Sequence, residues 1–148
     1  MSKREEIDKF LATEKIAIAG VSRKEKFGNE VFKQLKKAEF NVVPVNPFMD
    51  EFEGDKCYKD FSEIDNCKAV LIAVKKDKSL ELVKNATENN IKNIWFHSGS
   101  FTPEALAFCE ENNINYIKDE CILMYAEPVE GLHSFHRWIS KIFGKYQN

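Results

Sequence analysis

The chain has 148 residues, of which 43% are hydrophobic and 31% are charged, a composition typical of a globular protein rather than a disordered or fibrous one. Its formal net charge of −2 argues against a generally basic nucleic-acid-binding protein. The longest apolar runs, 16–21 and 69–74, are far shorter than the roughly 18 residues of a membrane span. No apolar segment follows the charged start of the chain, so we expect a cytoplasmic protein without a secretory signal.

Short, β-rich apolar runs alternate with amphipathic stretches, which is the pattern of a parallel α/β sheet. Their nearly continuous apolar character is typical of strands that are covered on both faces by helices. The predicted strands are Lys15–Gly20, Asn41–Val45, Ala69–Val74, Asn93–Phe96 and Ile114–Ile117. We therefore predict a Rossmann-like α/β fold: a doubly wound, five-stranded parallel sheet with helices on both faces and the strand order 3-2-1-4-5.

Helices are predicted between these strands. The apolar periodicity indicates helices over Phe27–Ala38 and Asp77–Asn89, and Thr102 followed by Pro103 is typical of a helix start. The letters Glu-Asn-Asn-Ile occur twice, at 88–91 and 111–114, each time just before a strand. Because Asn tolerates the left-handed conformation that ends many helices, both segments are expected to turn from helix into strand in the same way.

Two segments do not follow this alternation. Phe48–Phe61 is acidic and lacks a helical period, and a short helical turn at Phe61–Asp65 is expected in place of a crossover helix. Near the end of the chain, Leu132–Phe143 has an apolar stripe, which favours a helix that covers the sheet or forms a homodimer contact over one that binds a membrane. No linker divides the sequence, so residues 1–148 are predicted to form a single domain.

The segment that carries the functional prediction follows the first strand. Ligands of open α/β sheets bind beyond the carboxyl ends of the strands. There the sequence places a small-residue turn, a hydroxyl group and three cations at the start of a helix: Gly20-Val21-Ser22-Arg23-Lys24-Glu25-Lys26-Phe27-Gly28. Such a helix start suits a phosphate group. The alternative is a tight turn flanked by solvated lysines.

Features of a dinucleotide-binding motif that this sequence lacks help to distinguish between possible phosphate ligands. A dinucleotide fingerprint needs G-x-G-x-x-G and an acidic residue after the second strand. Here Ser22 replaces the second glycine, and the second strand ends in Asn46 and Pro47 without a carboxylate, which weakens an NAD interpretation. Arg23, Lys24 and Lys26 instead suit a ligand with more negative charge, such as one with an additional ribose phosphate, and both coenzyme A (CoA) and NADP fit that description.

Several motifs make the family recognisable. They are Ile18-Ala19-Gly20-Val21-Ser22-Arg23, Lys26-Phe27-Gly28-Asn29, Val42-Val43-Pro44-Val45-Asn46-Pro47, Gly54-Asp55-Lys56-Cys57-Tyr58, Asn93-Ile94-Trp95-Phe96, Glu120-Cys121-Ile122-Leu123-Met124-Tyr125 and Phe135-His136-Arg137-Trp138. With these motifs in order, the chain resembles the small stand-alone CoA-binding proteins, which are similar to the N-terminal domain of the succinyl-CoA synthetase α subunit.

This resemblance implies a domain that binds CoA or an acyl-CoA at the carboxyl edge of the sheet. Lys76 stands where family members often have proline, and His97 and Ser98 stand where they commonly have glutamine. By resemblance, phosphates are held after the first strand, the nucleotide is flanked after the second, and the adenine end lies after the third. The predicted ligand-binding residues are Gly20, Val21, Ser22, Arg23, Lys26, Phe27, Gly28, Asn46, Pro47, Val74, Lys75, Lys76, His97 and Ser98.

No catalytic or metal-binding constellation is found. The synthetase's catalytic histidine belongs to a second domain, and no cysteine or carboxylate is spaced to complete a metal site with His133 and His136. Cys121 follows the fifth strand and could form a mixed disulfide with the CoA thiol. We predict non-catalytic binding of a small nucleotide ligand, with no nucleic acid or membrane as partner. An NADP-dependent oxidoreductase or redox sensor, and an interaction scaffold with a vestigial pocket, stay open as alternatives.

Overall fold

The computed structural model describes residues 2–125, so the amphipathic segment predicted at Leu132–Phe143 lies outside the described residues. The main sheet of this part of the chain consists of five parallel strands: β1 (Ile16–Ala19), β2 (Val42–Val45), β5 (Ala69–Ile72), β6 (Asn93–Phe96) and β7 (Asn115–Ile117). All five strand predictions are confirmed, and with them the α/β fold class.

The predicted strand order is wrong. The observed order is β2-β1-β5-β6-β7, which is 2-1-3-4-5 when the strands of this sheet are numbered along the chain. Ile16 pairs with Val42 on one side of β1 and with Ala69 on the other, so β5 lies beside β1 rather than beside β2. The order therefore reverses between β1 and β5, and the carboxyl ends of these two strands are the expected ligand edge.

The connection between β2 and β5 explains this order. Its first half packs into the core on one face of the sheet, and its second half packs into the core on the other face. The two groups of core residues are Met49, Phe52 and Cys57, followed by Phe61, Ile64 and Cys67. Because the chain changes faces here, the next strand forms beside β1.

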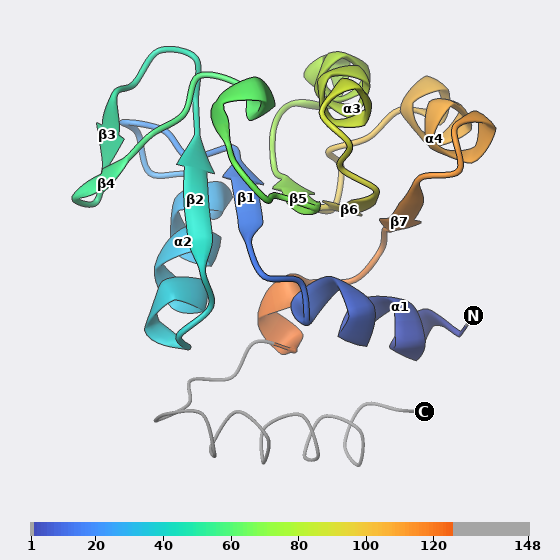
Figure 1. The fold of residues 1–148 in the computed structure, drawn as a ribbon, viewed down its shortest axis with the longest axis horizontal. Coiled ribbons are helices and arrows are strands. Elements are labelled where there is room, and N and C mark those ends of the chain that lie inside the picture. Colours follow the sequence, from blue (N-terminus) through green and yellow to red (C-terminus); the bar gives the residue numbers. More distant parts are fainter. Residues whose placement is uncertain (1, 126–148) are drawn as a thin grey trace.

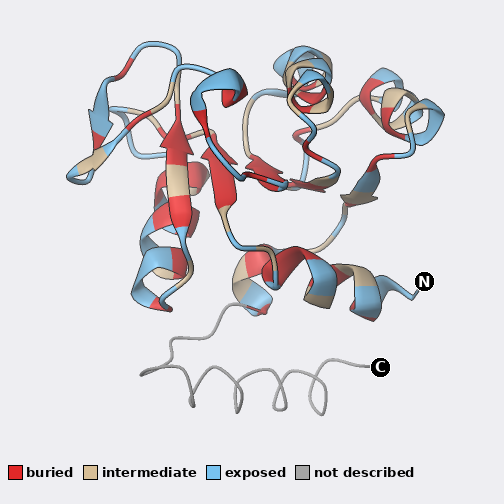
Figure 2. Ribbon diagram, viewed as in Figure 1, coloured by how far each residue is buried: buried red, intermediate tan, exposed pale blue. Residues whose placement is uncertain are grey.

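Helices cover both faces of the sheet, as predicted (Figure 1). The helices α1 (Lys3–Leu11) and α2 (Phe27–Lys37) share one core with the sheet, and α3 (Ser79–Glu88) and α4 (Pro103–Glu111) share the other. The inner strands β1 and β5 are buried on both faces (Figure 2). In the first core, the rings of Phe10 and Trp95 meet edge to face with their centroids 5.3 Å apart.

Local signals explain where the helices begin and end. The Thr102 hydroxyl accepts a hydrogen bond from the Ala105 N–H at 3.1 Å, which confirms the predicted start of α4. Asn90 and Asn113 have φ angles of 62° and 56°, which confirms the predicted left-handed turns after α3 and α4. α1 was not predicted, although Ser2 caps it by accepting from the Glu5 N–H at 3.1 Å.

The segment after β2 contains a hairpin that was not predicted, formed by β3 (Glu51–Phe52) and β4 (Asp55–Lys56). Its two turn residues, Glu53 and Gly54, both have positive φ angles, 51° and 82°, as two-residue hairpin turns with the native strand twist require. Ion pairs join the hairpin to α2, between Lys33 and Glu53 and between Lys36 and Asp55. The short helical turn predicted after it is confirmed at Phe61–Glu63.

On the side of the edge strand β2 that faces away from β1, Tyr58 forms backbone hydrogen bonds. The Tyr58 N–H donates to the Pro44 C=O at 2.9 Å, and the Tyr58 C=O accepts from the Asn46 N–H at 2.9 Å.

No helix among residues 2–125 is both long enough and apolar enough to cross a bilayer.

Candidate functional site at the carboxyl edge of the sheet

The loop between β1 and α2 begins and ends at a glycine that has no space for a side chain. Gly20 has a φ of 141°, and a Cβ atom on it would lie 2.3 Å from the Ala73 carbonyl oxygen, just beyond β5. A Cβ atom on Gly28 would lie 2.5 Å from the Gly20 carbonyl oxygen. The two glycines therefore let the start of α2 pack directly on the carboxyl end of β1.

Asn29 holds the loop in shape. Its buried side chain accepts from the Ser22 N–H at 2.8 Å and donates to the Ser22 C=O at 2.9 Å and the Lys24 C=O at 3.0 Å. The Ser22 hydroxyl accepts from the Lys24 N–H at 3.2 Å. The site prediction did not include Asn29. Its position in the first turn of a helix, directly after a glycine and a loop, was the available signal, because side chains there often reach back to the backbone before the helix.

The N-terminus of α2 has no side-chain cap. Lys26 occupies the N-cap position, where it makes no capping hydrogen bond, whereas Ser2 and Thr102 cap α1 and α4. Within the described residues, the N–H groups of Phe27 and Gly28 donate to no protein acceptor. Uncapped N–H groups and the positive end of the helix dipole together favour an anion at this position.

A second loop, after β2, is tied to the first. The Asn46 side chain donates to the Val21 C=O at 2.7 Å and accepts from the Phe48 N–H at 2.7 Å. The Arg23 guanidinium donates to the Phe48 C=O at 2.8 Å. Arg23, predicted as a phosphate contact, thus also links the two loops.

A third loop, after β6, reaches the same edge through His97. Its ring stacks on the ring of Phe27, with centroids 3.9 Å apart and an interplanar angle of 14°. Burial of the imidazole lowers the pKa of His97, because desolvation disfavours its charged form. The predicted residues Phe27 and His97 are therefore direct neighbours, and His97 favours its neutral form.

The other predicted residues lie at the same edge but are less constrained. Pro47, Lys75, Lys76 and Ser98 are exposed, and Val74 is half-buried against the α3 and α4 core. Among residues 2–125, the side chains of Lys26, Lys75 and Lys76 make no hydrogen bond or ion pair. The structure thus joins the loops after β1, β2 and β6 through side chains, and the loop after β5 approaches them through the backbone of Ala73.

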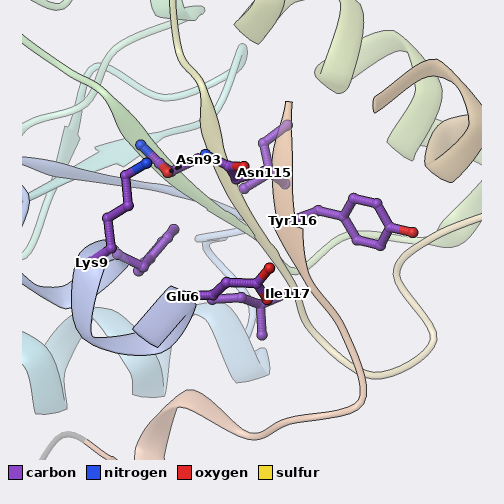
Figure 3. A pocket seen from close by; sticks show the side chains of 8 residues that line it. Glu6, Lys9, Asn93, Asn115, Tyr116 and Ile117 are labelled. Atoms are coloured by element: carbon purple, nitrogen blue, oxygen red, sulfur yellow. Dashed lines mark hydrogen bonds between the residues drawn. The ribbon is translucent and has the colours of Figure 1, made fainter. Parts of the chain in front are cut away.

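Two hollows on the surface of the described residues lie away from this loop. The one in Figure 3 is lined by Glu6 and Lys9 of α1 and by Asn93 and Asn115, the first residues of β6 and β7. It therefore lies at the amino ends of the strands, the edge opposite the predicted ligand. A second hollow flanks the edge strand β2, between Lys36 and Lys56. The glycine contacts and the helix terminus mark the candidate site.

The cysteines give little support to redox chemistry. Burial raises the pKa values of the Cys57 and Cys67 thiols, and it raises the pKa of Cys109 to about 12. A thiol with a raised pKa stays protonated and is a poor nucleophile. Cys121 is exposed, at the residue before the helical turn Ile122–Met124. Residues 2–125 contain no cluster of His, Cys, Asp and Glu side chains that could hold a metal ion.

Comparisons with known proteins find one matching family model and several similar proteins. A family model described as a CoA binding domain matches residues 14–127. The uncharacterized protein YneT of Bacillus subtilis (strain 168) is 27% identical over 123 residues, covering 82% of this chain and 91% of the relative. A conserved hypothetical protein from Pyrococcus furiosus is 34% identical with a TM-score of 0.71, covering 75% of this chain and 97% of that one. A hypothetical protein from Pyrococcus horikoshii OT3 is 28% identical with a TM-score of 0.77, and the match covers 84% of this chain and 89% of that one.

Proposed function

Because the chain belongs to the CoA-binding domain family, we propose that it binds coenzyme A or an acyl-CoA at the carboxyl edge of the sheet, through the loop from Gly20 to Gly28. The observation that carries this proposal is the uncapped N-terminus of α2, which a glycine contact holds against the end of β1. An anionic ligand there would take the place of the missing cap.

The loop residues divide the binding between them. The N–H groups of Phe27 and Gly28 are available to the pyrophosphate, and the Ser22 hydroxyl, which already accepts from Lys24, can donate its own proton to a phosphate oxygen. Lys24 and Lys26 are exposed beside this helix end and would offset the ligand's negative charge. The Asn29 side chain bonds only the backbone of Ser22 and Lys24, so it leaves the Ser22 hydroxyl and the helix N–H groups available to the ligand.

Binding without catalysis is the proposed role. The described residues bring no nucleophile and base together at this edge, and His97 faces the ring of Phe27. Three of the four cysteines are buried, which gives no support to a redox sensor built on them. We therefore propose that the chain holds a CoA ligand as a small cytoplasmic binding protein.

The test is a calorimetric titration of the ligand-stripped full chain with CoA, dephospho-CoA, NAD and NADP. We expect CoA to bind more tightly than dephospho-CoA, because a cation at the site would contact the ribose phosphate that dephospho-CoA lacks. We expect NAD and NADP to bind weakly. Lys26→Glu should weaken CoA binding. The matched control is Lys92→Glu, which makes the same charge change at an exposed residue just before β6, at the opposite edge of the sheet.

Two results would overturn the proposed ligand, and a third would overturn the proposed binding site. Tight binding of NADP with indifferent binding of CoA would point to an oxidoreductase. No binding of any of the four ligands would point to a scaffold with a vestigial pocket. Equal weakening by Lys26→Glu and Lys92→Glu would mean that net charge, rather than the α2 terminus, drives the association.

A further inference from the structure

The segment that follows β5 concentrates positive charge at the surface. Lys75, Lys76 and Lys78 occur within four residues, and all three side chains are exposed. Within the part of the chain that the structure describes, their ammonium groups make no hydrogen bond or ion pair, whereas Lys36 and Lys59 pair with carboxylates of the hairpin segment. Because neighbouring like charges repel one another, this segment would be stabilised by a bound anion.

The backbone that carries these lysines is fixed. Lys76–Lys78 forms a single turn of 3-10 helix, in which the Lys78 N–H donates to the Lys75 C=O at 3.0 Å. The hydroxyl of the buried residue Ser79 donates to the Lys76 C=O at 2.7 Å. The fold therefore sets the points from which the lysine side chains extend, and binding an anion requires only those side chains to become ordered.

This turn begins at the candidate site. β5 lies beside β1 in the sheet, and the strand order reverses between the two. Directly after β5, the Ala73 N–H donates to the Ala19 C=O at 2.8 Å, and the Ala73 carbonyl oxygen lies against Gly20. Lys75 follows Ala73 by two residues. The lysines thus leave the sheet next to the loop from Gly20 to Gly28, but from a different strand.

The proposed ligand has two separate phosphate groups to place at this edge. In CoA, the pyrophosphate is attached to the 5′ oxygen of the ribose, and a phosphomonoester is attached to its 3′ oxygen. A phosphomonoester carries a charge of about −1.5 to −2 at pH 7, which makes it a strong partner for ammonium groups. If the N-terminus of α2 holds the pyrophosphate, the 3′-phosphate lies one ribose away and needs cations of its own.

We propose that Lys75 and Lys76 bind the ribose 3′-phosphate of CoA and thereby make the protein select CoA over dephospho-CoA. This inference rests on the proposed function and adds to it the residues that select the ligand. Lys78 adds a third positive charge to the same turn, and Asp77 offsets one of them. The proposal agrees with the expectation that the adenine end of the ligand lies after this strand. It also gives Lys76 a role that the proline common at this position in the family could not perform.

The experiment measures the affinities of the full chain for CoA and dephospho-CoA, which differ only in the 3′-phosphate, by calorimetry at low salt. The test variant is Lys75→Gln/Lys76→Gln, which removes two charges and keeps long polar side chains. The matched control is Lys68→Gln/Lys92→Gln, which makes the same charge change at exposed residues just before β5 and β6, at the opposite edge of the sheet.

We expect the test variant to bind CoA about tenfold more weakly than the wild type does, because two exposed charge pairs are lost. Its affinity for dephospho-CoA should stay within about twofold of the wild-type value, because that ligand lacks the group the lysines contact. Retained binding of dephospho-CoA also shows that the variant is folded. The control should keep the wild-type preference for CoA.

Two further measurements have a defined direction. Asp77→Asn should increase the preference for CoA, because it removes the negative charge among the lysines. Added salt should reduce the preference in the wild type more than in the test variant, because exposed charge pairs are screened.

Three results would overturn this assignment while leaving CoA binding intact: equal affinity of the wild type for the two ligands, an unchanged preference in the test variant, or the same loss of preference in the control. If the wild type binds neither ligand, the proposed function fails instead, and the role of the lysines fails with it. The two failures are therefore distinguishable.

Discussion

The side-chain amide of Asn29 bonds both backbone groups of Ser22, accepting from its N–H at 2.8 Å and donating to its C=O at 2.9 Å. A residue of the helix thus fixes the loop that precedes it. Because the side chain of Asn29 is 7% exposed, water cannot readily replace these bonds when the amide is removed.

Replacing this amide by an apolar group should therefore loosen the loop. Asn29→Leu leaves the loop N–H and C=O groups without their partner, and we expect it to lower the free energy of unfolding by about 1–3 kcal/mol. CoA affinity should fall as well. Urea unfolding and calorimetry measure the two effects. Gln34→Ala is the control, because this amide on the same helix bonds only Glu30 at the surface; equal effects in the two variants would contradict the role of Asn29.

Gly28→Ala tests the close contact between α2 and β1, because its expected effect on stability is opposite to that of the same substitution at an ordinary helix position. In an ordinary helix position, alanine is more favourable than glycine by about 1 kcal/mol. At Gly28 the new Cβ would lie 2.5 Å from the Gly20 carbonyl oxygen, so backbone atoms of the loop must move. We expect Gly28→Ala to destabilise the protein and to weaken CoA binding. A stabilised variant in urea unfolding would show that α2 does not need this close contact.

The pH dependence of stability should include a contribution from His97. Burial lowers its pKa from the ordinary value of 6.5, so between the two values the unfolded chain binds a proton that the folded chain does not. Stability is therefore present above pH 6.5 and decreases as the pH falls through the folded pKa. His97→Phe keeps an aromatic ring against Phe27 and should reduce this decrease in thermal melts between pH 7.5 and 5. Identical pH profiles for variant and wild type would refute the assignment.

The four thiols should react unequally. Burial raises the pKa values of Cys57, Cys67 and Cys109, whereas Cys121 is exposed. Brief treatment of the native protein with iodoacetamide, followed by peptide mass spectrometry, should locate the label at Cys121. In urea, all four cysteines should be labelled at similar rates. Rapid labelling of Cys109 in the native state would mean that its surroundings open more readily than its burial implies. Oxidation in the presence of CoA then tests whether Cys121 forms a mixed disulfide with it.

Much of the fold was readable from local patterns. The five strands follow from their apolar runs, and the turns at Asn90 and Asn113 follow from a repeated sequence. α1 was also readable: Ser2 and Glu5 have the spacing of a capping box, and Ile7, Phe10 and Leu11 form an apolar stripe. The charge of this segment by itself does not reveal the stripe, so a helix over residues 3–11 was not predicted.

The strand order could not be predicted from such local patterns. It depends on which core Phe61 and Cys67 join after the hairpin, and both sides of a doubly wound sheet offer an apolar surface to such residues. Periodicity within a segment reports which side chains are buried, but not against which partner. A contact between segments far apart in the sequence therefore decided the order.

The candidate site was partly predictable for a similar reason. The glycines and cations follow one another in the sequence, so the loop after β1 could be recognised. The bonds from Asn29 to Ser22 and from Arg23 to Phe48 depend on the three-dimensional path of two loops. Such bonds between side chains and backbone leave little trace in composition or spacing.

The bonds between Tyr58 and the edge strand β2 also affect how the protein behaves at high concentration. An exposed sheet edge is a template on which a second chain can add a strand, the first step towards aggregation. Along the outer side of β2, Tyr58 already occupies the Pro44 carbonyl, and the Pro44 nitrogen has no proton to donate. The carboxyl half of this edge strand is thereby closed to intermolecular strand addition.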